Sequence, residues 1–163
     1  TFTERAISLL EQHNNSEPFF MYFSSQNCHA PNQVPEYYEN LYAHVKDADR
    51  RTYLGMVTAL DDSIGNLTRK LDELGMLEDT IIAFTSDNGG ATYASGRNFP
   101  LRGGKMTAFE GGHRVRAFIN APNTLTYEYN DMFHAVDWLP TLLNAALGVP
   151  VGKKYICAIF SFF

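Results

Sequence analysis

The clearest periodic pattern in the chain runs from about residue 48 to residue 74. Apolar side chains recur there every three or four positions, at Tyr53, Met56, Leu60, Ile64, Leu67, Leu71 and Leu74. This spacing places them on one face of an α-helix, so the sequence predicts a long amphipathic helix that ends at Gly75. A shorter helix is predicted for residues 3–13, where Glu4 falls in the first turn.

Two continuous apolar runs flank the long helix, at residues 19–24 and 80–86. Parallel strands that are covered on both faces do not alternate apolar and polar positions, so both runs predict buried strands. The order strand, long helix, strand is typical of a crossover unit in a parallel sheet. A third strand is predicted at 115–120, and a last helix that Asp137 would cap, with Pro140 in its first turn.

Two loops leave the predicted strands, and both carry polar residues. Residues 25–35 include His29, and the long Gly-rich stretch 87–114 opens with Asp87-Asn88-Gly89-Gly90. Ligands gather at the carboxyl ends of the strands in an open parallel sheet, so both loops are candidates for a site.

A carboxylate beside a side-chain amide oxygen suits Ca²⁺ or Mg²⁺. Asp-Asn-Gly-Gly is also a common turn sequence. Taken one at a time, His29 could equally be an ordinary loop histidine, and Lys105 a solvated surface lysine. Single motifs therefore leave both interpretations open.

Composition narrows the class of protein. The 163 residues are 45% hydrophobic and 13% aromatic, which predicts one globular domain. A net charge of −5 provides no basic field, so nucleic acid is not an expected partner, and an anionic substrate would need a few local cations. No run of roughly 18 uncharged apolar residues occurs, so we expect no membrane span.

Several short patterns bear on processing. Asn14 and Asn66 begin Asn-x-Ser/Thr sequons, which permit glycosylation in the secretory path. Cys28 and Cys157 match neither a zinc spacing nor a disulfide framework. The first residues show no initiator Met and no signal peptide, so we expect the chain to begin within a longer protein. Use of the sequons and the oligomeric state stay open.

Two other groupings of polar residues are poor candidates. Asp61 and Asp62 are adjacent on the long helix, so their side chains diverge by about 100° and favour a solvated face. His134 and Asp137 could face each other at i and i+3, but no Gly-x-Ser-x-Gly accompanies them. A serine hydrolase is therefore not favoured.

Six segments, in one order and one spacing, resemble the sulfatase family and in particular its arylsulfatase B-like branch. They are residues 29–35, 53–65, 84–90, 98–105, 109–114 and 137–143. The resemblance covers nearly all of residues 1–148, as a partial sulfatase catalytic domain. It implies an α/β, alkaline phosphatase-like fold, a mostly parallel sheet flanked by helices, truncated at both ends. Residues 149–163 do not resemble the expected continuation, and we interpret them as a divergent apolar tail.

Carried over position by position, the resemblance makes Asp87 and Asn88 ligands of Ca²⁺, Lys105 a contact to the sulfate, and His29 the proton donor to the leaving-group oxygen. It implies calcium-assisted hydrolysis of a sulfate ester, of a sulfated sugar or an aryl sulfate, by a lysosomal or secreted protein. Such groups make chemical sense, because negative charge builds on the sulfuryl oxygens and the departing alkoxide. Arg102 would anchor the loop and Arg114 would pack against it.

The sequence also departs from the family. Sulfatases carry a Cys-x-Pro-Ser-Arg motif whose cysteine becomes formylglycine, with two further acidic metal ligands and a Lys and His pair. None of these is found in the 163 residues, since His-Ala-Pro follows Cys28 and Ala-Ile-Phe follows Cys157. We therefore expect an incomplete catalytic domain that is inactive alone.

Two alternatives to a sulfatase stay open. One is a non-catalytic relative that binds anionic glycans or partners. The other is a phosphatase or phosphodiesterase of the same superfamily, which usually holds paired metals. The single Asp-Asn pair and Lys105 favour sulfate over phosphate.

Overall fold

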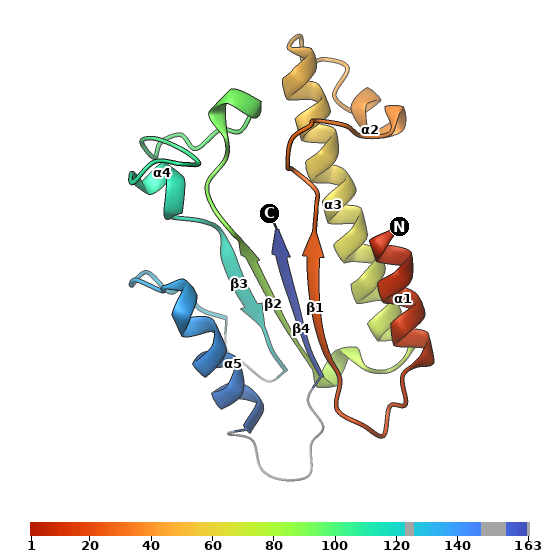
Figure 1. The fold of residues 1–163 in the computed structure, drawn as a ribbon. Coiled ribbons are helices and arrows are strands. Elements are labelled where there is room, and N and C mark those ends of the chain that lie inside the picture. The colour runs from red at the N-terminus through yellow and green to blue at the C-terminus, as the bar shows by residue number, and fades with distance from the viewer. Residues whose placement is uncertain (123–125, 148–155, 163) are drawn as a thin grey trace.

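A four-stranded sheet forms the centre of the molecule. The computed structural model describes residues 1–122, 126–147 and 156–162. The sheet order is β1 (Phe20–Ser25), β4 (Ile156–Phe162), β2 (Thr80–Ser86) and β3 (Ala117–Asn120). The first three of these strands are parallel, and β3 runs antiparallel to β2. Figure 1 shows α1 and α3 beside β1 and α5 on the opposite side of the sheet.

Helices α1 (Phe2–Gln12) and α3 (Ala48–Glu73) cover one face of the sheet. Asp47 caps α3, because its side chain accepts a hydrogen bond from the amide of Arg50. The apolar faces of the two helices pack with the sheet into one core of buried residues, which are Ala6, Leu10, Phe23, Leu60, Leu67, Leu71, Met76 and Ile82. The apolar period read from the sequence is therefore the buried face of α3.

Helix α5 (Trp138–Leu147) packs on the other face. Leu142 forms a second buried cluster with Ile81 and Ala83 of β2, and Trp138 packs against it. Because Ile82 belongs to the first core and its two neighbours to the second, β2 is buried on both faces. This explains the continuous apolar run at 80–86, and the predicted strand is confirmed.

The shorter elements differ more from the predictions. They are α2 (Glu36–Asn40), η1 (Leu77–Asp79), η2 (Thr92–Ala94), α4 (Glu110–His113) and η3 (Ala135–Asp137). Asp137 directly precedes α5, the helix it was predicted to cap, and its side chain accepts from the His134 amide at 2.7 Å, while His134 caps η3. Pro140 lies in the first turn of α5, as predicted.

The carboxyl-terminal strand was not predicted. Residues 156–162 form β4 between β1 and β2, while 149–155 lie outside the described residues. The division of the chain at 148 and 149, drawn on sequence resemblance, stays a prediction. Within the described ranges, no helix is both long and apolar enough to cross a membrane.

Candidate functional site

The carboxyl edge of the parallel strands brings two loops to the same level. Ser25 at the end of β1 and Ser86 at the end of β2 are each in register with Phe162 of β4. With one strand between them, the two chain exits are separated by two strand spacings, about 10 Å. Figure 1 shows the loops that follow β1 and β2 above the arrowheads of these strands. A small group placed between the two loops could therefore touch both.

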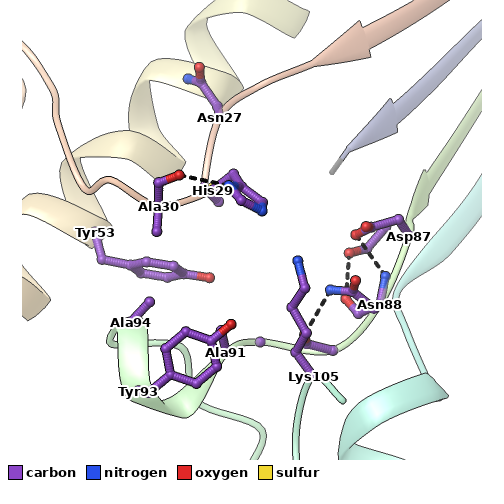
Figure 2. A pocket seen from close by; sticks show the side chains of 14 residues that line it. Asn27, His29, Ala30, Tyr53, Asp87, Asn88, Ala91, Tyr93, Ala94 and Lys105 are labelled. Carbon is purple, nitrogen blue, oxygen red and sulfur yellow. Dashed lines mark hydrogen bonds between the residues drawn. The ribbon is translucent and has the colours of Figure 1, made fainter.

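A pocket of about 110 Å³ lies between these loops. His29, Asp87, Asn88 and Lys105 all line it. Figure 2 shows the Lys105 side chain extending into the space between His29 and the Asp87–Asn88 pair. The fold thus brings all four residues predicted from the sequence into one pocket, while their chemical roles stay predictions.

The Asp87–Asn88 pair is held by hydrogen bonds within its own turn. The Asn88 amide donates to Asp87 Oδ1 at 2.7 Å, and Asn88 Nδ2 donates to the Gly89 carbonyl at 3.0 Å. Ser86 Oγ donates to the Asn88 carbonyl at 2.9 Å. Because the side-chain nitrogen of Asn88 is used within the turn, its Oδ1 is the atom that can bind a cation.

The donor atoms of the pair suit calcium in kind but supply only part of a coordination sphere. Carboxylate and amide oxygens are the ligands that Ca²⁺ prefers, and it takes about six to eight of them. In the parts of the chain that the structure describes, no group of three or more His, Cys, Asp or Glu could hold a metal ion. A calcium ion at Asp87 and Asn88 would therefore take its other oxygens from water, from a bound anion or from further protein groups.

The orientation of His29 follows from one hydrogen bond. Its Nδ1 lies 2.7 Å from the carbonyl oxygen of Ala30. A carbonyl only accepts, so Nδ1 carries the proton of this bond and Nε2 is the atom that can serve a ligand. Figure 2 shows the His29 ring and the Lys105 side chain directed toward each other.

The loop that carries Lys105 is built by backbone-to-backbone packing. We call Gly89, Gly103, Gly111 and Gly112 the glycine framework. The Gly89 amide donates to the Gly112 carbonyl at 2.9 Å, and a Cβ atom on Gly89 would overlap the carbonyl oxygen of Gly111. A Cβ on Gly111 would likewise overlap the Gly103 carbonyl oxygen. Residues other than glycine would push these segments apart.

Asn98 fastens the Asp87–Gly90 turn to the Lys105 segment. Its Oδ1 accepts from the Gly90 amide, and its Nδ2 donates to the carbonyls of Gly90 and Gly103. The Lys105 amide also donates to the Gly90 carbonyl, at 3.2 Å. Sequence reasoning named Asn98 only as the start of a family motif. Its partners are backbone atoms, which leave no mark in the sequence pattern.

The two arginines have different environments. The Arg102 guanidinium lies 4.0 Å from the centroid of the Phe109 ring, a cation–π contact that fits the expected anchoring of the loop. Arg114 pairs with Glu110 at 3.2 Å, and both side chains are more than half exposed. Arg114 therefore lies at the surface and not in a packed interior.

The remaining wall of the pocket includes Cys28, Tyr53 and Tyr93, which sequence reasoning did not assign to the site. Burial raises the pKa of the Cys28 thiol to about 11, so it is uncharged near neutral pH. Burial also raises the pKa of Tyr53, against the opposing charge of Arg50. Tyr53 was predicted for the apolar face of the long helix and begins the family segment 53–65, without a role in the site, and Tyr93 belongs to no motif. Asp61 and Asp62 are exposed on α3, as expected.

Comparisons with known proteins point to one family. The family model described as Sulfatase matches residues 1–149. Arylsulfatase J of Mus musculus is 38% identical over 150 residues, which cover 90% of this chain and 25% of that protein. N-acetylgalactosamine-6-sulfatase of Mus musculus is 34% identical over 121 residues, 71% of this chain and 22% of that protein. The chain thus spans about a quarter of the length of these relatives.

A solved structure supports the fold. The crystal structure of Ps i-CgsB in complex with k-i-k-neocarrahexaose superposes with a TM-score of 0.73 at 34% identity, over 75% of this chain and 27% of that one. The predicted α/β, alkaline phosphatase-like fold with a mostly parallel sheet is confirmed.

Proposed function

The chain belongs to the sulfatase family, and we propose that it supports the hydrolysis of a sulfate ester. One observation carries this proposal: a cation, a histidine, a carboxylate and an amide oxygen from three separate segments line a single pocket at the carboxyl edge of the sheet. These are the groups that a reaction building negative charge on oxygen requires. The substrate would be bound and polarised by Lys105, His29, Asp87 and Asn88.

Each residue has a role that its geometry permits. The Lys105 ammonium would pair with a sulfate oxygen. Asp87 and Asn88 would hold Ca²⁺, which when bound polarises the sulfate and stabilises developing negative charge. His29 would donate a proton from Nε2 to the leaving-group oxygen while Nδ1 keeps its own proton on the Ala30 carbonyl, so the role requires the imidazolium form with a proton on both ring nitrogens.

The described residues offer no activated nucleophile in this pocket. Cys28 lines it, but its pKa of about 11 keeps the thiol protonated and weakly nucleophilic. We infer that the residues of this chain bind and orient the ester and that they do not attack it. By resemblance, the attacking group of a sulfatase is the formylglycine made from Cys-x-Pro-Ser-Arg.

The names of two similar proteins support a proposal for the substrate class. One relative is named for a sulfated N-acetylgalactosamine, and the solved structure holds a neocarrahexaose. We propose that the substrate is a sulfated sugar and that the protein is lysosomal or secreted.

Asn14 and Asn66 are exposed, so glycans could attach there. Expression through a secretory pathway should give a glycosidase-sensitive mass, and Asn14→Gln with Asn66→Gln should abolish it.

Binding of anions tests the proposal directly. Titrating the chain with methyl sulfate and with methyl phosphate, with and without Ca²⁺, should give tighter binding of sulfate and a gain from calcium. Lys105→Ala should weaken sulfate binding about tenfold, equivalent to ~1.4 kcal/mol. Lys46→Ala is the matched control, because Lys46 is exposed and outside the pocket lining. Equal affinities for the two lysine variants would reject the site, and tighter binding of phosphate would favour the phosphatase alternative.

A further inference from the structure

The wall of the pocket that faces the Asp87–Asn88 pair is aromatic. Tyr53 reaches it from α3 and Tyr93 from η2. Figure 2 shows the two rings on the side away from Asp87, with the hydroxyl of Tyr53 directed toward Lys105. The roles proposed above for Lys105, His29, Asp87 and Asn88 leave these two rings without an assigned role.

The size of the pocket separates the sulfate from the rest of the substrate. Sites that enclose a whole small molecule measure roughly 300–1,000 Å³. This pocket measures about 110 Å³, so a tetrahedral anion fits within it and a larger attached group would extend beyond it. A leaving group that extends outward would meet Tyr93, which lines the pocket and is 72% exposed.

Tyr93 is exposed, yet the segment that carries it is fixed. Arg50 Nη1 donates to the Ser95 carbonyl at 2.6 Å, and Asn32 Nδ2 donates to the Ala94 carbonyl at 3.2 Å. These two bonds tie the segment just after Tyr93 to α3 and to the loop after β1. The aromatic wall is thus built into the fold.

Arg50 contacts both Tyr53 and the segment that follows Tyr93. Its guanidinium lies 5.1 Å from the centroid of the Tyr53 ring while its Nη1 holds Ser95. One side chain therefore contacts the Tyr53 ring and the backbone two residues after Tyr93.

We propose that Tyr53 and Tyr93 form a ring-binding subsite, which packs against the cyclic leaving group of the ester while the sulfate occupies the inner pocket. The inference rests on the proposed sulfate site and adds a selection for ring-bearing esters over acyclic ones. Aromatic faces bind both aryl rings and the apolar faces of sugar rings, so the shared chemistry is a flat, partly apolar ring.

The test compares ligands that share the sulfate and differ in the ring. The chain is titrated with methyl sulfate, phenyl sulfate and galactose 6-sulfate. Tyr93→Ala should weaken both ring-bearing esters about three- to tenfold and leave methyl sulfate unchanged, whereas Tyr93→Phe should retain their affinity. The control is Tyr37→Ala, a tyrosine of α2 that is 69% exposed and outside the pocket lining. Loss for phenyl sulfate alone identifies an aryl leaving group, and loss for galactose 6-sulfate alone a sugar.

The outcomes separate this inference from the proposed function. If Lys105→Ala weakens all three ligands but Tyr93→Ala weakens none, or weakens methyl sulfate equally, the sulfate site stands and the ring-binding subsite is rejected. If Lys105→Ala has no effect on any ligand, the proposed function fails and the subsite fails with it.

Discussion

The side chain of Asn98 pairs with Gly90 as a neighbouring strand would. Asn98 Oδ1 accepts from the Gly90 amide at 2.7 Å, and Asn98 Nδ2 donates to the Gly90 carbonyl at 2.9 Å. A third bond, from Nδ2 to the Gly103 carbonyl at 3.1 Å, extends the connection to the segment that leads into Lys105. The Asn98 side chain thereby sets the distance between the Asp87–Asn88 turn and Lys105.

Replacement of this amide should uncouple the two segments. Asn98→Asp keeps the acceptor for the Gly90 amide but sets a carboxylate oxygen against the carbonyls of Gly90 and Gly103. We expect a loss of about 2–4 kcal/mol in the free energy of unfolding, from two lost hydrogen bonds and the repulsion, measured by urea denaturation. Methyl sulfate should also bind more weakly. Asn40→Asp, on the exposed end of α2, should leave both quantities unchanged, and a similar loss there would refute the coupling.

Two glycine-to-alanine changes should have opposite effects on the stability of the protein. Gly89→Ala places a methyl group onto the Gly111 carbonyl oxygen, which only a shift of backbone can relieve, so we expect a loss of several kcal/mol. Gly65 lies within α3 with nothing near its missing Cβ, so Gly65→Ala should stabilise the protein by about 0.5–1 kcal/mol. Thermal unfolding of both variants checks the pair, and a neutral Gly89→Ala would contradict the glycine framework.

Calcium should stabilise the fold through Asp87. At about a hundred times the dissociation constant, a ligand that binds only the folded state adds ~2.7 kcal/mol. Asp87→Asn retains the acceptor for the Asn88 amide but removes the charge, so most of the calcium-induced rise in Tm should disappear. Asp61→Asn, on the exposed face of α3, should keep the full rise. The prediction fails if chelation of calcium leaves the Tm of the unsubstituted chain unaltered.

The Cys28 thiol should be slow to alkylate. Burial raises its pKa from 9.0 to about 11, so at pH 8 the thiolate is about a hundredfold scarcer than in the unfolded chain. Iodoacetamide labelling, followed by peptide mapping, should show this difference between native protein and protein in urea. Equal labelling rates in the two states would contradict the assigned burial.

The raised pKa of Cys28 also makes the stability of the protein depend on pH. A group whose pKa is raised on folding contributes its full stabilisation at pH values below its pKa in the unfolded chain. This stabilisation is lost as the pH rises toward the pKa of the group in the folded protein. Stability from Cys28 is therefore present below pH 9.0 and declines up to about pH 11. Between pH 8 and pH 10.5 the unsubstituted chain should lose about 1–2 kcal/mol more than Cys28→Ala does.

The pattern of apolar residues predicted those helices and strands in which the buried positions recur periodically or form a continuous run. The long helix was expected at 48–74 and is observed as Ala48–Glu73, because a 26-residue amphipathic face records its packing in every turn. The strand at 80–86 is observed with the same bounds, since both of its faces are covered. The family motifs added His29, Asp87, Asn88 and Lys105, which the fold gathers in one pocket.

The features that were missed depend on contacts that no residue pattern encodes. Asn98 binds backbone atoms of nearby residues, and backbone atoms are the same whatever the side chain. The aromatic wall brings Tyr53 of α3 beside Tyr93 of η2, which are too far apart in the sequence for a local pattern to relate them. Strand β4 was likewise read as a tail, because an apolar run of seven residues does not reveal which strands it will pair with.

Because it contains the glycine framework, the stretch 87–114 depends on contacts with neighbouring segments to stay ordered. Glycine loses more backbone conformational entropy on folding than any other residue, and it has no side chain whose burial would offset that loss. Gly89, Gly103, Gly111 and Gly112 are held in place by the hydrogen bonds of neighbouring backbone and by Asn98. A ligand that bridges Asn88 and Lys105 would restrict the same segments. Affinity for the anion and protection of the Gly89 amide from hydrogen exchange should therefore rise and fall together.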